Sequence, residues 1–377
     1  MKKTSIVIVA VTVVLGLAGV STIALRSTQQ PNQAADIISK SDKVYVATED
    51  GGSIDVIDAA SRSIIKKIEL ASENGANGEM YMAHNVQVAP DNKSVWATAN
   101  AMSDGEHNSN GHGEHDMAES TPSDQLVVIN PRKDEIVRRI DIGPGVHLAH
   151  VVLTPDSRYA LAVAAETNEV YKIDTSSFRV VGKAKAKDGA GLHGLRLSSD
   201  GRIAYVAMMA GKGIGKLDIQ SFQFEYIPLD GQAVQTAVTP DGRYVAASVF
   251  DSKSVAIYDT QDKSVQYAKL PVDAKGPLQI YPTSDSRYVY VADQGHEFGQ
   301  EDGDKLYKID IQTKNVIQTV KVGTAPHGVV LSPDDKFTYV TNMVSNDVSV
   351  VDNGTGKELS RIPTGAKPNG ISYWSYN

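Results

Sequence analysis

The sequence predicts an all-β fold, a seven-bladed β-propeller, on three observations: a recurring unit, its spacing, and complementary chain ends. In each unit an apolar stretch ends in Pro-Asp or Ser-Asp, a turn follows, and then come a Tyr/Val/Ala-rich strand and a strand ending in Asp or Asn. The turn aspartates are separated by 65, 44, 41, 44 and 49 residues, at Asp91, Asp156, Asp200, Asp241, Asp285 and Asp334. Four strands in just over forty residues are typical of a propeller blade.

Each unit contains four short antiparallel strands, named A to D from the central axis outward. The B strands are rich in β-branched and aromatic residues that suit a buried sheet, in SVWATAN, YALAVAAE, IAYVAMM, YVAASVF, YVYVADQ and TYVTNMV. The C strands follow as LVVIN, VYKID, GKLDI, VAIYD, LYKID and VSVVD. The Asp or Asn near each C-strand end can close a turn by bonding its own backbone.

The two chain ends complete a seventh blade. Near the start, KVYVATED, SIDVID and IIKKIEL supply strands B, C and D, whereas KPNGISYWSYN at the end supplies a lone strand A. Pairing them closes the ring and leaves no open sheet edge. The propeller domain is therefore expected over residues 40–377.

Residues 1–33 form a separate segment, a signal peptide or an N-terminal membrane anchor with a short linker. Lys2 and Lys3 precede an apolar run from Ser5 to Leu25, which Arg26 closes. About 20 apolar residues are enough to span a bilayer, so both cleavage and retention as an anchor are open. Either alternative places the rest of the chain outside the cytoplasm, in the periplasm or at the cell surface.

Composition excludes several classes of site. The chain has no cysteine, which excludes disulfides, thiolate metal sites and covalent c-type haem attachment. Its net charge of −8 becomes −11 without residues 1–33, which carry three Lys/Arg and no acid. Such a charge argues against nucleic acid as a partner. A propeller is self-contained, so a monomer is expected, with the membrane contacted only through an uncleaved N-terminal segment.

The segment Tyr339-Val340-Thr341-Asn342, with Pro326-His327-Gly328-Val329 and Ser332-Pro333-Asp334 upstream, resembles the YVTN-repeat β-propeller family. That family includes YncE-like and surface-layer-type proteins, and its blade pattern is similar to the propellers of cytochrome d1 and nitrous oxide reductase. The resemblance covers about residues 40–377. It implies the propeller fold, but not one function.

Two insertions, residues 101–123 and 294–303, lengthen loops between strands B and C. In a propeller these loops emerge on the same face as the connections from strand D to the next strand A. All nine histidines fall in loops of these two kinds or at the start of a strand A, at His84, His107, His112, His115, His147, His150, His193, His296 and His327. That face is the predicted functional face, where a protein partner or small ligand would bind.

Several histidines share a register. His84, His193 and His327 lie seven residues before the turn aspartate, where other blades have Ala149, Val234, Leu278 and Asn369. His150 lies six before it, like Gln235 and Gln279. Imidazoles that converge from several blades suit copper or zinc. We therefore expect a metal site at the channel mouth among His84, His147, His150, His193 and His327, beside the polar residues Gln235, Gln279 and Asn369.

The histidine-rich tract with His107, His112 and His115 is a second candidate for metal capture. For every one of these histidines a structural role remains open: His193 and His327 fit turns that pack neighbouring blades, and the tract fits a solvated acidic loop.

The sequence favours a non-catalytic binding or scaffold protein with a candidate histidine-lined metal site, and it assigns no catalytic residue. One alternative is a metal- or haem-dependent redox enzyme or accessory protein, which the resemblance to the reductase propellers implies. The other is a lactonase-like hydrolase, for which Glu49, Glu166, Asp251 and Asp293 lie in suitable loops. No cofactor is certain from the sequence, with copper or zinc the candidates.

Overall fold

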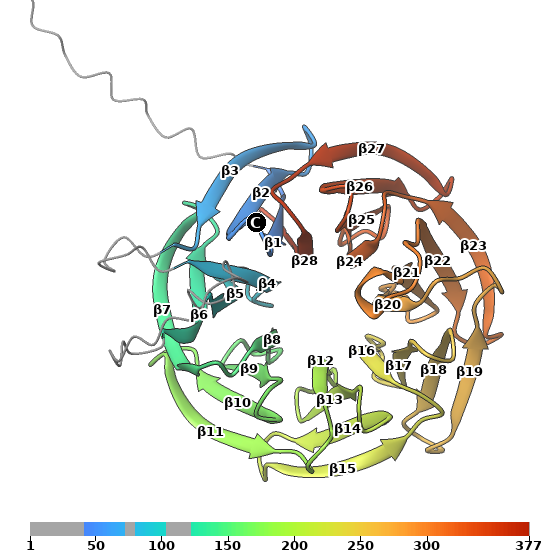
Figure 1. Ribbon diagram of the computed structural model, residues 1–377, viewed down its shortest axis with the longest axis horizontal. Helices are drawn as coiled ribbons and strands as arrows, with labels where there is room; N and C mark the ends of the chain where they lie inside the picture. The colour runs from blue at the N-terminus through green and yellow to red at the C-terminus, as the bar shows by residue number, and fades with distance from the viewer. Residues whose placement is uncertain (1–40, 72–79, 103–121, 377) are drawn as a thin grey trace, which may run out of the picture. The chain divides into compact units, whose positions relative to one another are not determined.

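The computed structural model describes residues 41–71, 80–102 and 122–376. In these ranges 28 strands form seven four-stranded antiparallel sheets, arranged as a ring around a central axis (Figure 1). The predicted seven-bladed all-β propeller is confirmed. Residues 1–40, which include the predicted signal or anchor, and residues 103–121, which hold the histidine-rich tract, lie outside the described residues.

The closing blade joins both ends of the chain and consists of β28 (Pro368–Trp374), β1 (Lys43–Thr48), β2 (Ser53–Asp58) and β3 (Ser63–Glu69). Six consecutive blades follow. The first three contain β4 (Tyr81–Val88), β5 (Val95–Ala101), β6 (Ser123–Asn130) and β7 (Glu135–Pro144); β8 (Leu148–Leu153), β9 (Tyr159–Ala164), β10 (Glu169–Asp174) and β11 (Arg179–Lys185); and β12 (Leu192–Leu197), β13 (Ile203–Met208), β14 (Gly213–Asp218) and β15 (Gln223–Pro228).

The next three contain β16 (Ala233–Val238), β17 (Tyr244–Val249), β18 (Ser254–Asp259) and β19 (Val265–Lys269); β20 (Pro277–Pro282), β21 (Tyr288–Asp293), β22 (Lys305–Asp310) and β23 (Asn315–Lys321); and β24 (Pro326–Leu331), β25 (Phe337–Asn342), β26 (Asp347–Asp352) and β27 (Lys357–Pro363). A short 3-10 helix, η1 (His296–Phe298), lies in the loop between β21 and β22.

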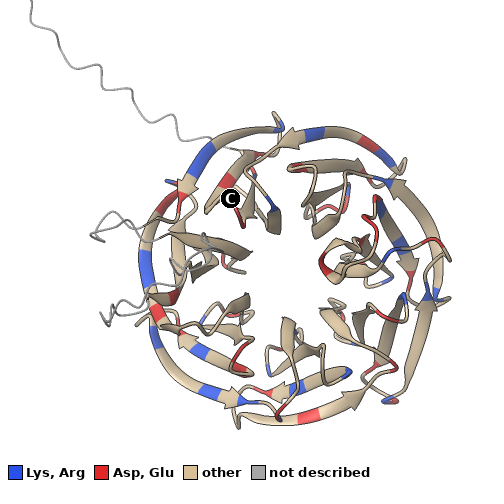
Figure 2. Ribbon diagram, in the orientation of Figure 1, with Lys and Arg blue, Asp and Glu red and all other residues tan. Residues whose placement is uncertain are grey.

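Burial changes from the inner strands to the outer ones. The second strand of every blade is almost entirely buried, because its two faces pack against the two neighbouring blades. The outermost strands alternate instead, as in β23 and β27, where the exposed residues are mostly polar. Figure 2 accordingly shows much of the lysine and arginine along the outer strands. The apolar core therefore lies between blades rather than at one centre.

The turn aspartates of the repeat have a structural role. The Thr154 hydroxyl donates to Asp156 at 2.6 Å, and the Arg158 amide donates to the same oxygen at 3.1 Å. These two hydrogen bonds, in this order of size, lower the pKa of Asp156. Equivalent Thr-x-Asp or Ser-x-Asp turns recur along the chain, at Asp200, Asp241, Asp285 and Asp334. The repeated aspartate thus fixes the turn from the first to the second strand of a blade.

The ring closes as the sequence predicts. β28 pairs antiparallel with β1, with Lys43 opposite Trp374, and the dark-red strand lies beside the blue one in Figure 1. Trp374 is buried, and its indole N–H donates to the carbonyl oxygen of Asn92 in the first blade at 2.8 Å. Closure therefore buries a large aromatic side chain and ties the last strand to the next blade.

A buried ion pair also joins the closing blade to the first blade. The Lys43 ammonium donates to Asp134 at 2.7 Å and to the carbonyl oxygen of Pro131 at 2.9 Å, and the Tyr45 hydroxyl donates to the other oxygen of Asp134. Every partner in this group is buried, so each charge depends on the other for its compensation.

The described ranges contain no helix with the length and apolar character needed to cross a membrane.

Candidate metal centre

All seven innermost strands share one irregularity. In each, the pairing with the second strand shifts register within the first few residues of the strand. The unpaired residues are 84–85, 149–150, 193–194, 234, 278–279, 327–328 and 369–370. Such β-bulges re-aim side chains. The break falls on the two register positions where the sequence concentrates histidine, glutamine and asparagine. We call this end of the ring the histidine end and the opposite end the turn end.

The bulges occur in two forms. In three blades a buried apolar residue is followed by a polar one: Ala149-His150, Val234-Gln235 and Leu278-Gln279. In the other four a polar residue is followed by Asn or Gly: His84-Asn85, His193-Gly194, His327-Gly328 and Asn369-Gly370. His84 and His150 therefore belong to different registers and still reach the same place.

The glycines of the second form are needed because neighbouring strands approach closely. A Cβ on Gly194 would lie 2.1 Å from the side-chain oxygen of Gln235, and a Cβ on Gly328 would lie 2.3 Å from the carbonyl oxygen of Asn369. Both distances are far below van der Waals contact. The small residue after the histidine therefore lets the next blade pack against the bulge.

Three histidines from three successive blades converge. His84 on β4, His150 on β8 and His193 on β12 each offer one ring nitrogen, and these nitrogens all lie within 4.8 Å of one another. Their ring centroids are 5.2 to 5.9 Å apart. Among the described residues this is the one group of three or more His, Asp or Glu close enough to share a metal ion. We call it the histidine triad.

The Nδ1 atoms of two triad rings, His193 and His84, already contact a protein group. His193 Nδ1 lies 2.9 Å from the carbonyl oxygen of Val234, which can only accept, so Nδ1 carries the proton and Nε2 keeps its lone pair. His84 Nδ1 lies 3.4 Å from Glu49 Oε2, and His84 Nε2 is buried without a hydrogen-bond partner. A carbonyl or carboxylate behind an imidazole is the usual support of a metal-binding histidine.

His150 is held by a chain of amides. Gln235 Nε2 donates to Gln279 Oε1 at 2.7 Å, and Gln279 Nε2 lies 3.4 Å from His150 Nε2. The last contact is long for a hydrogen bond and does not fix the tautomer. His150 Nδ1 is buried with no partner. All three rings thus present a nitrogen that no described protein group satisfies.

The pKa of His84 shifts in the opposite direction from those of the other two triad rings. Burial would lower the pKa of His84, but the hydrogen bond and charge of Glu49 raise it above its ordinary value. Burial would likewise raise the pKa of Glu49, but His84 and then Asn369 lower it to about 2. Burial and the charge of His84 lower the pKa of His193 to about 4. The pKa of His150 is held well below its ordinary range by burial and then by His193.

The remaining histidines have other surroundings. His147 lies beside His84, with ring centroids 5.8 Å apart, but is not part of the triad. His327 Nδ1 accepts from Gln294 at 2.8 Å, and its Nε2 is buried without a partner. His296 bonds Asp302 at 2.7 Å on the surface. Of the five histidines expected at the channel mouth, the structure brings three within shared-ligand distance.

Two residues of this site were not singled out from the sequence. Gln294 and Glu297 belong to the predicted insertion, which packs back on the ring: Glu297 Oε2 lies 3.5 Å from His327 Nδ1, and the Phe298 and Phe250 rings are 3.9 Å apart. The Glu297 charge also raises the pKa of His84, after the larger effects of burial and Glu49. The extra length of this loop was the available signal, but length does not show where a loop folds.

The acidic residues proposed for a hydrolase do not form a cation site. Asp293 accepts from the amides of Lys275 and Gly276, and Asp251 accepts from the amide of Gln232. Glu49 supports His84, as described above. Neither these residues nor Glu166 belong to a group of three ligands within the described ranges.

Fold and site together define a seven-bladed β-propeller with three imidazoles at one end of its axis. No family model matches the chain, so membership of the YVTN-repeat family stays a prediction. The chain is 27% identical over 179 residues to antigen Lp49 of Leptospira interrogans, covering 42% of this chain and 37% of that protein. It is 26% identical over 170 residues to protein NirF of Pseudomonas aeruginosa, covering 41% and 39%. The chain thus spans about two-fifths of each relative.

Solved structures share the fold. A chain of the hydrazine synthase of Kuenenia stuttgartiensis aligns with a TM-score of 0.65 at 18% identity, covering 82% of this chain and 92% of that one. A protein from Lactobacillus plantarum aligns with a TM-score of 0.67 at 13% identity, covering 88% and 99%. Identities this low show the common fold alone.

Proposed function

We propose that this protein is an extracytoplasmic, non-catalytic metal-binding propeller that holds one zinc or copper ion on the histidine triad. The observation that carries the proposal is that three histidine rings bring ring nitrogens within 4.8 Å of one another, and that each ring has a nitrogen without a hydrogen-bond partner among the described residues, buried in His84 and His150. Buried polar atoms are almost always hydrogen-bonded in proteins. A cation shared by His84, His150 and His193 would satisfy all three.

The donor set fits borderline divalent ions. Three neutral imidazoles with no thiolate suit Zn²⁺ or Cu²⁺, and a fourth position would remain for water or an exchanging ligand. The depressed pKa values of His150 and His193 keep these two rings neutral at pH 7. Glu49 would hold the tautomer of His84 that leaves Nε2 free, once the second proton of that ring has left.

The location rests on the N-terminal sequence. Lys2, Lys3 and the apolar run that follows are the pattern of an exported or anchored protein. The loop of residues 294–303 contacts His327 at the histidine end, and the charge of its Glu297 reaches His84. A loop-rich face beside the metal suits binding of a protein partner or small ligand, consistent with a scaffold or carrier role.

A redox enzyme or accessory protein is the second candidate. It is favoured by the three-ligand set, which leaves a coordination position open to a substrate, and by the partial sequence similarity to protein NirF. The binding role is preferred because, in the described residues, the carboxylates near the triad are already paired with histidines.

The test is metal content. The full chain, purified without a histidine tag and incubated with Zn²⁺ or Cu²⁺, is expected to retain about one equivalent by elemental analysis after desalting. The His84→Ala/His150→Ala double variant should lose this ion, whereas His296→Ala, which removes a surface imidazole, should retain it. A further variant with His107, His112 and His115 changed to Asn separates the loop tract from the triad.

Circular dichroism and a urea unfolding curve establish that the double variant is folded. Unchanged metal content in a folded double variant would contradict the assignment of the triad. Turnover of a redox substrate by the loaded wild type, lost in the double variant, would favour the second candidate over a binding role.

A further inference from the structure

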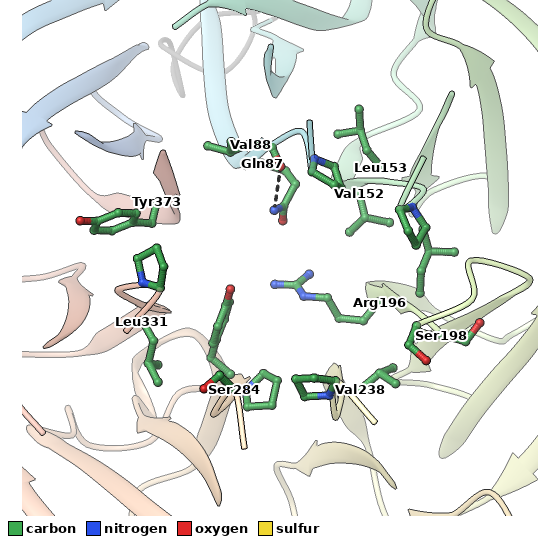
Figure 3. Close-up of a pocket in the computed structure, with 18 of the residues that line it drawn as sticks. Gln87, Val88, Val152, Leu153, Arg196, Ser198, Val238, Ser284, Leu331 and Tyr373 are labelled. Carbon is green, nitrogen blue, oxygen red and sulfur yellow. Dashed lines mark hydrogen bonds between the residues drawn. The ribbon is translucent and has the colours of Figure 1, made fainter. Parts of the chain in front are cut away.

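A cavity of about 560 Å³ lies at the turn end of the ring, opposite the histidine end. Its walls come from the ends of the innermost strands and from the turns that follow them (Figure 3). Most of the wall is apolar and includes Val88, Val152, Leu153 and Leu331. The cavity is therefore large enough for a small organic molecule and suited to an apolar body.

One charged side chain points toward the middle of this cavity. Arg196 lies on β12, three residues after His193, and Figure 3 shows its guanidinium extending from the wall inward. Burial lowers its pKa. In the part of the chain that the structure describes, its guanidinium makes a single hydrogen bond, 2.9 Å from Nη1 to the carbonyl oxygen of Leu195, and it pairs with no carboxylate.

Such an arginine is unusual. The guanidinium carries five N–H donors in a planar fork that matches a carboxylate. Arg196 is half-buried, and a charge that is partly removed from water is costly unless a counter-charge compensates it. The carboxylate that lines the cavity, Asp335, accepts instead from the amide of Ser284 at 2.8 Å and from its hydroxyl at 2.6 Å. The fork thus has free donors directed at the cavity.

A hydroxyl group lies within the electrostatic reach of the guanidinium. Tyr281, on β20, lines the same cavity, and the charge of Arg196 acts on its hydroxyl. Burial raises the pKa of Tyr281, so the hydroxyl keeps its proton and can donate. The cavity thus combines one cation, Arg196, and one neutral hydrogen-bond donor, Tyr281, with otherwise mostly apolar walls.

We infer that this cavity binds a small organic carboxylate with an apolar body, its carboxylate on Arg196 and its body against the apolar wall. An inorganic anion fits less well, because Arg196 is the one cation among the lining residues and phosphate or sulfate would leave the apolar wall unused. The site shares no lining residue with the histidine triad and does not depend on the proposed metal function, although the charge of Arg196 lowers the pKa of His150.

The experiment measures binding of 2-naphthoate to the full chain by its fluorescence, beside 2-naphthamide as the matched neutral probe. Naphthoate is expected to bind saturably and at least about tenfold more tightly than naphthamide, because hydrogen bonds to a charged group are the stronger ones. Arg196→Gln should weaken naphthoate binding at least about tenfold and leave naphthamide unchanged. Arg196→Lys keeps the charge and should recover part of the affinity.

Three outcomes would overturn the inference: no saturable binding of naphthoate, equal affinity for naphthoate and naphthamide in the wild type, or inorganic phosphate displacing naphthoate at equal concentration. The comparison of the two probes needs no variant, so it stands even where Arg196→Gln fails to fold. The His84→Ala/His150→Ala variant should bind naphthoate like the wild type, so failure of the metal proposal and failure of this one are distinguishable.

Discussion

Glu49 Oε2 lies 3.4 Å from Nδ1 of His84, although the two residues belong to neighbouring blades. Glu49 follows β1 in the closing blade, and His84 lies in the bulge of β4 in the first blade. The Asn369 amide, on β28, donates to the same Glu49 oxygen at 2.6 Å. Three segments distant in sequence thus orient one imidazole.

Glu49→Gln should weaken metal binding by about 10- to 100-fold, the usual effect of removing a carboxylate behind a metal-binding histidine. Glutamine keeps the shape of the side chain but loses the charge that favours proton donation from His84 Nδ1. Isothermal titration with Zn²⁺ measures the effect. Glu166→Gln is the control, because Glu166 is at the same end of the ring and outside the triad. Equal losses in both variants would remove Glu49 from its supporting role.

The metal-free protein should lose stability on acidification because of His193. Its pKa falls from 6.5 to about 4 on folding, so between these values the folded protein binds fewer protons than the unfolded chain. The free energy of unfolding therefore decreases as the pH drops through this window and is unaffected well above it. Urea unfolding in chelator at pH 7 and pH 5 measures the loss, which His193→Gln should reduce. The same loss in the variant would assign it to other groups.

Lys43→Met should destabilise the protein by about 3–5 kcal/mol, because it leaves the buried carboxylate of Asp134 without its cation. The control is Lys67→Met in the same blade, since Lys67 and Glu69 are an exposed pair, for which the expected loss is below about 1 kcal/mol. Urea unfolding curves compare the two. Similar small losses would show that the Lys43 pair does not hold the closing blade to the first blade.

Gly328→Ala should cost about 1–3 kcal/mol, the usual penalty for overpacking, because the new Cβ would lie 2.3 Å from the backbone oxygen of Asn369. Gly354→Ala is the matched control. Its Cβ would lie 3.5 Å from the nearest described atom, a side-chain oxygen of Asp352, so the change should stay within about 0.5 kcal/mol. Thermal unfolding distinguishes them, and equal midpoints would argue against close approach at the bulge.

The repeat predicted the fold well because each blade needs the same turn and strand chemistry, as the Asp156 turn shows. The sequence also located the polar ring, since the register of His84 and His150 falls on the bulge. It did not show which histidines meet. His84 and His150 lie in different registers and different forms of bulge, and both still reach the triad, whereas His327 shares the bulge form of His193 but contacts Gln294 instead.

The site features that the sequence did not predict depend on contacts between blades and on loop conformations. The link from Glu49 to His84 joins two blades, and the position of Glu297 depends on the fold of a loop; neither is encoded by the period of the repeat. Arg196 was missed for another reason. From sequence alone, a basic residue in a strand is expected to face solvent, and only the arrangement of the blades shows that the Arg196 side chain lines a cavity.

Because the closing blade contains both ends of the propeller, the residues that orient His84 are synthesised at very different times. Glu49 is among the first propeller residues to leave the ribosome and Asn369 among the last, and both are needed to orient His84. A nascent chain that lacks β28 already contains His84, His150 and His193, but not Asn369, which bonds Glu49 beside His84. Complete support for the triad is therefore reached only by the finished ring, so that metal retention would report on completed folding.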